Sequence, residues 1–233
     1  MAADPVPDDV EALAADRDAF LGLTPVSRET LARLDQFVEF LLPWSRRTNL
    51  IARSTIPTVW TRHVADSLQL LALAPEARCW IDLGSGAGFP GLVLACALAG
   101  EAGAAVHLVE SNGKKANFLR AAAAHLNVPA VVHAVRIEDF VQNDPPRPDV
   151  VTARALAPLN QLLTLAQPLL RGGARGLFPK GQDVEAELTE ASRYWSIDAE
   201  LVPSRTNAAS RIVVVRRLER RRKADKFHGK PRR

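Results

Sequence analysis

The fold is decided by the stretch Cys79-Trp80-Ile81-Asp82-Leu83-Gly84-Ser85-Gly86-Ala87-Gly88-Phe89-Pro90-Gly91. It begins as an apolar strand that reaches a carboxylate, continues through glycines at every second position, and leads into an apolar helical run. Glycine has no Cβ, so the backbone can turn tightly and approach a ligand closely. The start of the following helix presents unpaired N–H groups to the same ligand. The stretch therefore predicts a nucleotide-type binding loop in an α/β unit.

Two classes of cofactor use such a loop, and the neighbouring residues distinguish them. Residues 86–91 match the dinucleotide pattern G-x-G-x-x-G. However, Pro90 removes a backbone donor and Asp82 adds a carboxylate, and neither suits a pyrophosphate. S-adenosylmethionine carries a sulfonium and an ammonium and has no phosphate, so an acid before the loop suits it. The pattern D-x-G-x-G-x-G, with Gly84 and Gly86, therefore favours S-adenosylmethionine.

A second acid supports this cofactor. Residues 104–110 read as the next strand, and Glu110 stands at its carboxyl end, 28 residues after Asp82. In this fold, that position can accept hydrogen bonds from both ribose hydroxyls of a bound nucleoside. The alternative interpretation of Glu110 is an exposed acid at the end of a strand.

The chain after Arg78 alternates between strands and helices. Further strands are predicted at residues 130–135, 149–152, 176–179 and 211–215, and helices at 114–126, 159–170 and 183–195. Ligands of open α/β sheets bind beyond the carboxyl ends of the strands. Besides Asp82 and Glu110, the side chains expected there are Ile137, Glu138, Arg154 and Lys180.

The part before the sheet is predicted to be helical. Amphipathic helices are expected at residues 6–21 and 27–42, Pro43 ends the second, and a polar basic loop follows at 44–50. A third helix is expected at 58–74, where Arg62 and Asp66 are one turn apart and can form a surface ion pair. For His63 alone, a packed residue is the preferred interpretation.

Charge is unevenly distributed along the 233 residues, which carry a net +4. Residues 216–233 contain ten Lys and Arg and two acids, so the rest of the chain is at −4. Such a basic tail suggests a polyanionic partner, and a solubilising end is the alternative. The N-terminus is acidic, unlike a signal peptide, and no apolar run approaches a membrane span. We therefore expect a soluble, cytoplasmic protein that does not contact a membrane.

The acceptor chemistry is narrowed by exclusion. The residues after the fourth strand, 152–157, lack the Asn/Asp-Pro-Pro-aromatic motif of enzymes that methylate exocyclic amines. Neither Cys79 nor Cys96 is placed to attack cytosine C5, and their spacing makes no metal site. We therefore expect no metal.

Several motifs occur in one order along most of residues 38–182. They are Trp44 with Asn49-Leu50, Arg62-His63 with Asp66-Ser67-Leu68, Asp82 to Gly91, Lys114-Lys115 with Phe118-Leu119, Arg136-Ile137-Glu138, Arg154-Ala155 and Lys180-Gly181-Gln182. In this set and order the chain resembles the RsmG (GidB) family, enzymes that methylate guanine N7 in small-subunit ribosomal RNA. The basic tail departs from the Pro-rich basic segment with which that family usually ends.

The resemblance implies methyl transfer from S-adenosylmethionine to a guanine N7 of 16S rRNA, guanine 527 in its customary numbering. It implies an α/β fold, the Rossmann-like class I methyltransferase, with a mostly parallel seven-stranded sheet and helices on both faces. We expect a helical cap at residues 1–77, the methyltransferase domain at 78–217 and the basic tail at 218–233. We expect the chain to be a monomer, and its expected partner is 16S rRNA or the small ribosomal subunit.

The resemblance also assigns site residues. It implies S-adenosylmethionine contacts for Gly84, Phe89, Ile137, Glu138 and Arg154, beside Asp82, Gly86 and Glu110. No catalytic base is assigned, because guanine N7 carries no proton, and the candidates for orienting the acceptor are Arg154, Lys180 and His63. For Arg154 the alternative is an ion pair that ties the sheet to the cap, with Asp66 as partner. The candidates for RNA contact are Asn49, Arg62, Lys180, Arg220, Arg221 and Arg222.

Two other functions stay open. One is a small-molecule or protein methyltransferase of the same fold, and the other is a non-enzymatic, RNA-binding assembly factor with a vestigial cofactor pocket. Arg46, Arg47, Lys180 and the basic tail favour RNA over a small substrate. The intact set of Asp82, Gly84 and Glu110 disfavours the vestigial pocket.

Overall fold

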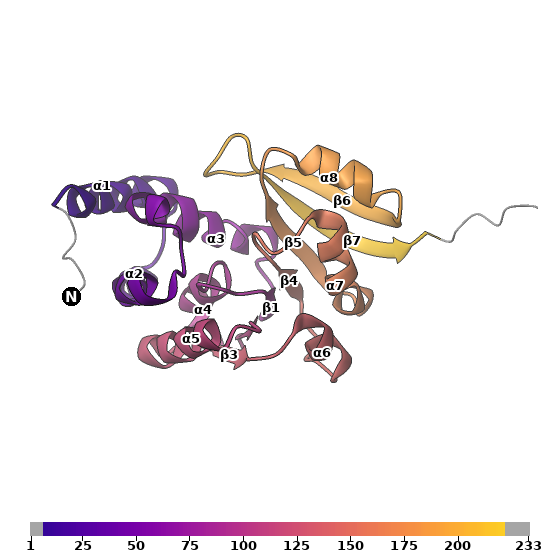
Figure 1. Cartoon of the computed structure of the whole chain (residues 1–233), viewed down its shortest axis with the longest axis horizontal. Coiled ribbons are helices and arrows are strands. Elements are labelled where there is room, and N and C mark those ends of the chain that lie inside the picture. Colours follow the sequence, from indigo (N-terminus) through magenta and orange to yellow (C-terminus); the bar gives the residue numbers. More distant parts are fainter. Residues whose placement is uncertain (1–6, 222–233) are drawn as a thin grey trace, which may run out of the picture.

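The computed structural model describes residues 7–221 and has a seven-stranded sheet at its centre (Figure 1). The strands are β1 (Cys79–Leu83), β2 (Ala105–Val109), β3 (Ala130–His133), β4 (Val150–Thr152), β5 (Arg175–Lys180), β6 (Trp195–Pro203) and β7 (Arg211–Arg220). Their order across the sheet is β3-β2-β1-β4-β5-β7-β6. β1 to β5 are parallel, and β7 is antiparallel to both β5 and β6. The predicted mostly parallel, Rossmann-like sheet is confirmed.

Helices cover both faces of this sheet. They are α4 (Gly91–Leu98), α5 (Gly113–Leu126), α6 (Ile137–Gln142), α7 (Leu159–Arg171) and α8 (Val184–Ala191). Successive strand residues point to opposite faces, so each strand contributes to two cores. In β1, Trp80 belongs to the core that includes residues of α4 and α5, whereas Ile81 belongs to the core with residues of α6, α7 and α8.

The helical cap begins with α1 (Pro7–Leu23) and α2 (Arg28–Thr48). Short turns follow: the 3-10 helix η1 (Arg53–Thr58), the π-helix η2 (Trp60–Ala65), α3 (Asp66–Leu68) and the 3-10 helix η3 (Leu71–Leu73). A bidentate ion pair joins Arg17 of α1 to Asp35 of α2, with Nε 2.6 Å from Oδ1 and Nη2 2.7 Å from Oδ2. The carboxylate of Asp16 accepts hydrogen bonds from the backbone N–H groups of Trp60 and Thr61 at 2.8 and 3.2 Å. α1 thus fixes the start of η2, which carries Arg62 and His63.

The structure corrects the predicted end of α2, which continues through Pro43 to Thr48. Proline removes one helical hydrogen bond, but the apolar stripe of the helix continues beyond it. Trp44 packs against Phe118 of α5, with ring centroids 5.6 Å apart. The predicted basic loop at 44–50 is therefore largely the last turn of a helix, and Asn49 caps it in the left-handed conformation (φ 47°).

Three further boundaries differ from prediction. The continuous helix expected at 58–74 is divided into η2, α3 and η3. The helix expected to reach Trp195 ends at Ala191, and Trp195 opens β6, a strand that was not placed from the sequence. The boundary expected at residue 217 falls inside β7, whose Leu218 is buried. None of the described helices is long and apolar enough to cross a membrane.

Candidate active site

Asp82 lies beneath the glycine loop and is only 1% exposed. One carboxylate oxygen accepts a hydrogen bond from the Thr152 hydroxyl at 3.0 Å, and the other accepts one from the backbone N–H of Gly91 at 3.1 Å. A Cβ at Gly91 would lie 2.7 Å from that second oxygen, so glycine lets α4 approach this closely. Burial raises the pKa of Asp82 to about 6, against these hydrogen bonds. Asp82 thus holds the loop and α4 together, and its burial does not favour the predicted direct contact with the cofactor.

Glu110 is bound to the turn of the glycine loop. Gly84 and Gly86 have φ of 71° and 56°, a region that favours glycine. The Glu110 carboxylate accepts hydrogen bonds from the backbone N–H of Gly86 at 2.9 Å and from that of Asn112 at 2.7 Å. An ionised carboxylate has about four acceptor positions, so Glu110 can hold the loop and still accept hydroxyl donors from a ligand. The structure therefore brings Gly84, Gly86 and Glu110 together, as the sequence predicts.

Ile137 and Glu138 open α6, directly beyond β3, as expected from the sequence. Ile137 packs against the core of α6 and α7, and Glu138 is exposed in the first turn. Glu110, Ile137 and Glu138 thus lie beyond the carboxyl ends of β2 and β3, on the side of the sheet where the glycine loop follows β1, and this set offers carboxylate, apolar and backbone groups. This set fits a ligand that brings hydroxyls, an apolar ring and positive charge, as S-adenosylmethionine does.

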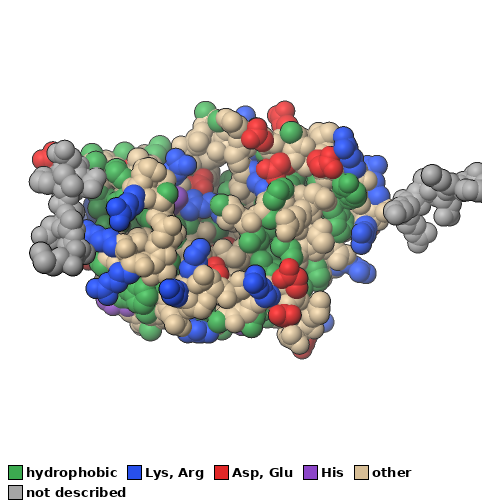
Figure 2. Space-filling view, in the orientation of Figure 1, with side chains coloured by type: hydrophobic (Ala, Val, Ile, Leu, Met, Phe, Trp, Pro, Cys, Tyr) green, Lys and Arg blue, Asp and Glu red, His purple; other side chains and the backbone are tan. Residues whose placement is uncertain are grey.

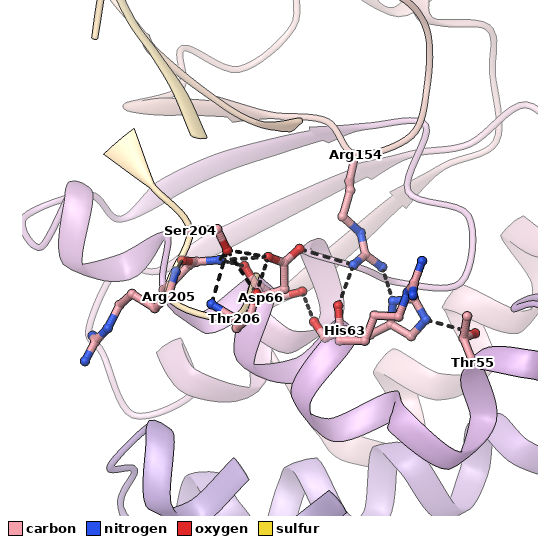
Figure 3. A network of polar contacts seen from close by, with 10 residues as sticks. Thr55, His63, Asp66, Arg154, Ser204, Arg205 and Thr206 are labelled. Atoms are coloured by element: carbon pink, nitrogen blue, oxygen red, sulfur yellow. Dashed lines mark hydrogen bonds and ion pairs between the residues drawn. The ribbon is translucent and has the colours of Figure 1, made fainter. Parts of the chain in front are cut away.

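Arg154 follows β4 and extends to the cap, where three acceptors surround its guanidinium (Figure 3). Its Nη2 donates to His63 Nδ1 at 2.7 Å, and its Nη1 lies 3.2 Å from the Arg62 carbonyl and 3.4 Å from Asp66 Oδ2. The guanidinium also lies 5.4 Å from the ring centroid of Phe89. Burial lowers the pKa of Arg154, while Asp66 raises it. The ion pair weighed as the alternative for Arg154 is thus present, and it fixes the guanidinium beside the loop.

His63 acts as a neutral hydrogen-bond acceptor for Arg154. Its Nδ1 faces the arginine donor, and its Nε2 lies 3.1 Å from the Thr55 hydroxyl, so the ring proton belongs on Nε2. Burial, followed by the charges of Arg154 and Arg62, lowers the pKa of His63 to about 3. The ring stacks on Phe89 with centroids 5.0 Å apart. Phe89 is itself 5% exposed and supports His63 and Arg154 from below.

A cleft of about 640 Å³ opens between the cap, the ends of β4 and β5, and the loop between β6 and β7. Its polar and charged lining side chains are Thr58, Thr61, Arg62, His63, Asp66, Arg154, Lys180, Glu187, Ser204, Thr206, Asn207, Ser210 and Arg211. The glycine loop is not part of this lining. Arg154 joins the two, because it lines the cleft and also contacts Phe89 of the loop.

Lys180 is engaged inside the protein. Its Nζ donates to the Ala157 carbonyl at 2.8 Å and to the Glu187 carboxylate at 2.7 Å, and its side chain is 11% exposed. The same Glu187 oxygen accepts the backbone N–H of Leu159, the first residue of α7. As placed, Lys180 stabilises the wall of the cleft, which does not favour the predicted contact with RNA phosphates.

The other RNA candidates are distributed over the molecule. Asn49 and Arg62 are exposed on the cap. Arg220 and Arg221 are exposed near Trp195, at the edge where the parallel strands begin and therefore opposite the cleft. Arg222 lies outside the described residues. The contribution of the loop between β6 and β7 was not predicted, because no strand was expected at β6 and the loop after it could not be placed.

Comparisons with known proteins agree with this arrangement. The family model of rRNA small subunit methyltransferase G matches residues 30–213. A protein from Nitrobacter hamburgensis named Ribosomal RNA small subunit methyltransferase G is 59% identical over 208 residues, which cover 89% of this chain and 80% of that protein. A protein of the same name from Bradyrhizobium sp. BTAi1 is 57% identical over 208 residues, with 89% and 94% covered.

Solved structures with a similar fold include two O-methyltransferases. The enzyme from Bacillus cereus in complex with SAH superposes with a TM-score of 0.59 at 15% identity, covering 89% of this chain and 100% of that one. TomG from Streptomyces achromogenes in complex with SAM gives a TM-score of 0.57 at 14% identity, with 90% and 99% covered. At these identities the likeness concerns the fold alone.

Proposed function

The chain belongs to the rRNA small subunit methyltransferase G family, and we propose that its acceptor is N7 of a guanine in 16S rRNA, guanine 527 in the customary numbering. As a member of that family it is an S-adenosylmethionine-dependent rRNA methyltransferase. We also propose that the protein acts as a monomer. We place it in the cytoplasm, because ribosomal RNA is modified where ribosomes assemble.

The observation that carries the N7 proposal is the state of the titratable groups in the cleft. Among the described residues that line it, Asp66 is paired with Arg154. Glu187 is likewise paired with Lys180. His63 has both ring nitrogens in hydrogen bonds. No carboxylate or imidazole of this lining is therefore placed to remove a proton, and guanine N7, which has a lone pair and no proton, requires none.

The residues of the chain then act mainly by holding the reactants. When bound, S-adenosylmethionine supplies an electrophilic methyl group on a sulfonium. We propose that Glu110 accepts hydrogen bonds from the hydroxyls of the cofactor and that the backbone at Gly84 and Gly86 lies against it. Arg154 uses three of its five N–H donors on Arg62, Asp66 and His63, which leaves two in a fixed orientation for the acceptor. Holding two reactants in line is worth up to about 7–11 kcal/mol in ideal cases, so positioning can account for much of the catalysis.

The surface supports approach of RNA from the side of the cap. Figure 2 shows Lys and Arg side chains over the cap and α5 and also near the end of β7, whereas Asp and Glu gather over α8 and α6. Exposed basic residues there include Arg46, Arg47, Arg53, Arg62 and Lys114. The deep major groove of A-form RNA hides N7, so the target guanine is expected in a loop or drawn out of its stack.

The proposal is tested by incubating the protein with methyl-labelled S-adenosylmethionine and either small ribosomal subunits or extracted 16S rRNA. Label is expected in the 16S rRNA of at least one substrate. A variant with Arg154→Ala provides the control, because it lacks the guanidinium that is proposed to orient the acceptor. Label confined to protein or to small molecules, with both RNA substrates unlabelled, would contradict the proposal.

A further inference from the structure

The loop between β6 and β7, residues 204–210, is bound to the cap by a compact set of hydrogen bonds (Figure 3). Asp66 Oδ1 accepts from the Thr206 hydroxyl at 3.0 Å, and the Ser204 hydroxyl lies 3.5 Å from the same oxygen. The backbone N–H of Arg205 donates to Gln69 Oε1 at 2.9 Å. Gln69 Nε2 in turn donates to Asp66 Oδ1 at 2.8 Å. The loop therefore contacts the cap through one carboxylate and its supporting amide.

The other oxygen of that carboxylate faces Arg154. Asp66 Oδ2 lies 3.4 Å from Arg154 Nη1, so the two oxygens of one side chain join the loop and the guanidinium. The side chains of Asp66 and Arg154 are 15% and 18% exposed, which shields the pair from water. Hydrogen bonds on both oxygens fix the plane of the carboxylate, and they strengthen each other in a shielded site.

The loop also lines the cleft. Ser204, Thr206, Asn207 and Ser210 line the same cleft as Arg154 and His63. Displacement of the loop would thus change a wall of the cleft and remove the Thr206 hydrogen bond from the carboxylate that contacts the arginine, and Gln69 alone would then hold Asp66 Oδ1. His63 and the Arg62 carbonyl would still accept from Arg154, so loss of the loop contact is expected to loosen the guanidinium without releasing it.

We propose that the loop between β6 and β7 is a positioning element for methyl transfer: Thr206, supported by Ser204, orients Asp66, and Asp66 holds the Arg154 guanidinium at the acceptor cleft. The inference rests on the proposed function and adds to it a segment about 140 residues from the cap in sequence. Thr206 is a positioning residue in this scheme, because it acts through Asp66 and Arg154.

The test compares Thr206→Val, which keeps the shape and removes the hydroxyl, with Thr206→Ser, which keeps the hydroxyl. Single-turnover methyl transfer to small ribosomal subunits is expected to slow by about 10- to 100-fold in Thr206→Val, as for a misplaced orienting group. Thr206→Ser should retain the wild-type rate, and cofactor affinity should be unchanged in both. Thr189→Val is the matched control, because that exposed hydroxyl donates to the Glu185 carbonyl of its own helix.

A second readout follows Arg154 directly. Separate, slowly exchanging NMR signals of the Arg154 Nη groups are expected in the wild type and in Thr206→Ser, and averaged signals in Thr206→Val. A wild-type rate in Thr206→Val, an equal loss in Thr206→Ser, or weaker RNA binding with an unchanged rate would each overturn the inference. If the wild type transfers no methyl to RNA, the proposed function fails, and unchanged Arg154 signals in Thr206→Val would still refute the positioning role.

Discussion

Glu110→Gln tests the connection between the glycine loop and β2. The glutamate accepts backbone N–H groups on both oxygens, from Gly86 and from Asn112. Glutamine has one acceptor oxygen, so it can satisfy one of these donors, and its NH₂ group must face the other. A hydrogen bond to a charged acceptor contributes about 1.5–3 kcal/mol, and the orphaned donor is partly shielded from water. The variant should therefore lose about 2–3 kcal/mol of folding free energy, which lowers the melting temperature by roughly 4–12 °C.

The same substitution should weaken cofactor binding. If Glu110 accepts a ribose hydroxyl, loss of that charged acceptor raises the Kd for S-adenosylmethionine by roughly 10- to 150-fold. Calorimetric titration and thermal unfolding measure the two effects separately. Glu190→Gln is the control, because that residue makes only an exposed ion pair with Arg193, and both readouts should stay near the wild type. Wild-type cofactor affinity in folded Glu110→Gln would show that Glu110 does not bind the cofactor.

Three further predictions concern Arg154, His63 and the tail. Arg154→Lys keeps the charge, but a lysine cannot reach the three acceptors together. Methyl transfer should therefore slow by roughly 100-fold, with the fold intact and no new dependence on pH between about 6 and 9. A wild-type rate or a shifted pH optimum would contradict the orienting role. Burial holds the pKa of His63 near 3, so the unfolded chain takes up the proton first, near 6.5, and stability falls as the pH drops below that value. Chemical unfolding should thus show that the wild type loses about 2 kcal/mol more than His63→Gln between about pH 7.5 and 5, whereas equal losses would mean an exposed ring. Removal of residues 222–233 leaves β7 complete. The slope of log K for RNA binding against log salt concentration should become shallower by about 0.7–0.9 per lost phosphate contact, and cofactor affinity should stay unchanged. An identical slope would exclude phosphate contacts by the tail.

The cofactor side of the site could be predicted from the sequence because its parts are local. β1, the glycine turn and α4 follow one another within twenty residues, and each has its own pattern. Glu110 could be placed because a parallel sheet aligns the carboxyl ends of neighbouring strands. What the sequence did not reveal is the direction of the Asp82 side chain, which turns beneath the loop and binds Gly91.

The acceptor side depends on contacts between distant segments. Asp66 meets Arg154 across 88 positions and Thr206 across 140, and no local pattern encodes such pairs. β6 did offer a signal, because Trp195, Ile197 and their successors alternate with polar residues. The helix predicted over residues 183–195 extended into the start of that strand. Likewise, the sequence places Lys180 at the carboxyl end of a strand, but its pairing with Glu187 depends on where α8 packs.

The most direct test of the central claim is the identity of the methylated nucleoside. Small-subunit rRNA methylated by the protein is digested to nucleosides, and the labelled product is identified by mass spectrometry against synthetic standards. We expect 7-methylguanosine and a rate that does not depend on ionisation of a cleft side chain near neutral pH. Label on an exocyclic amine, on a ring carbon or on a ribose hydroxyl would contradict it, because each of those acceptors must lose a proton that no described group in the cleft is placed to take.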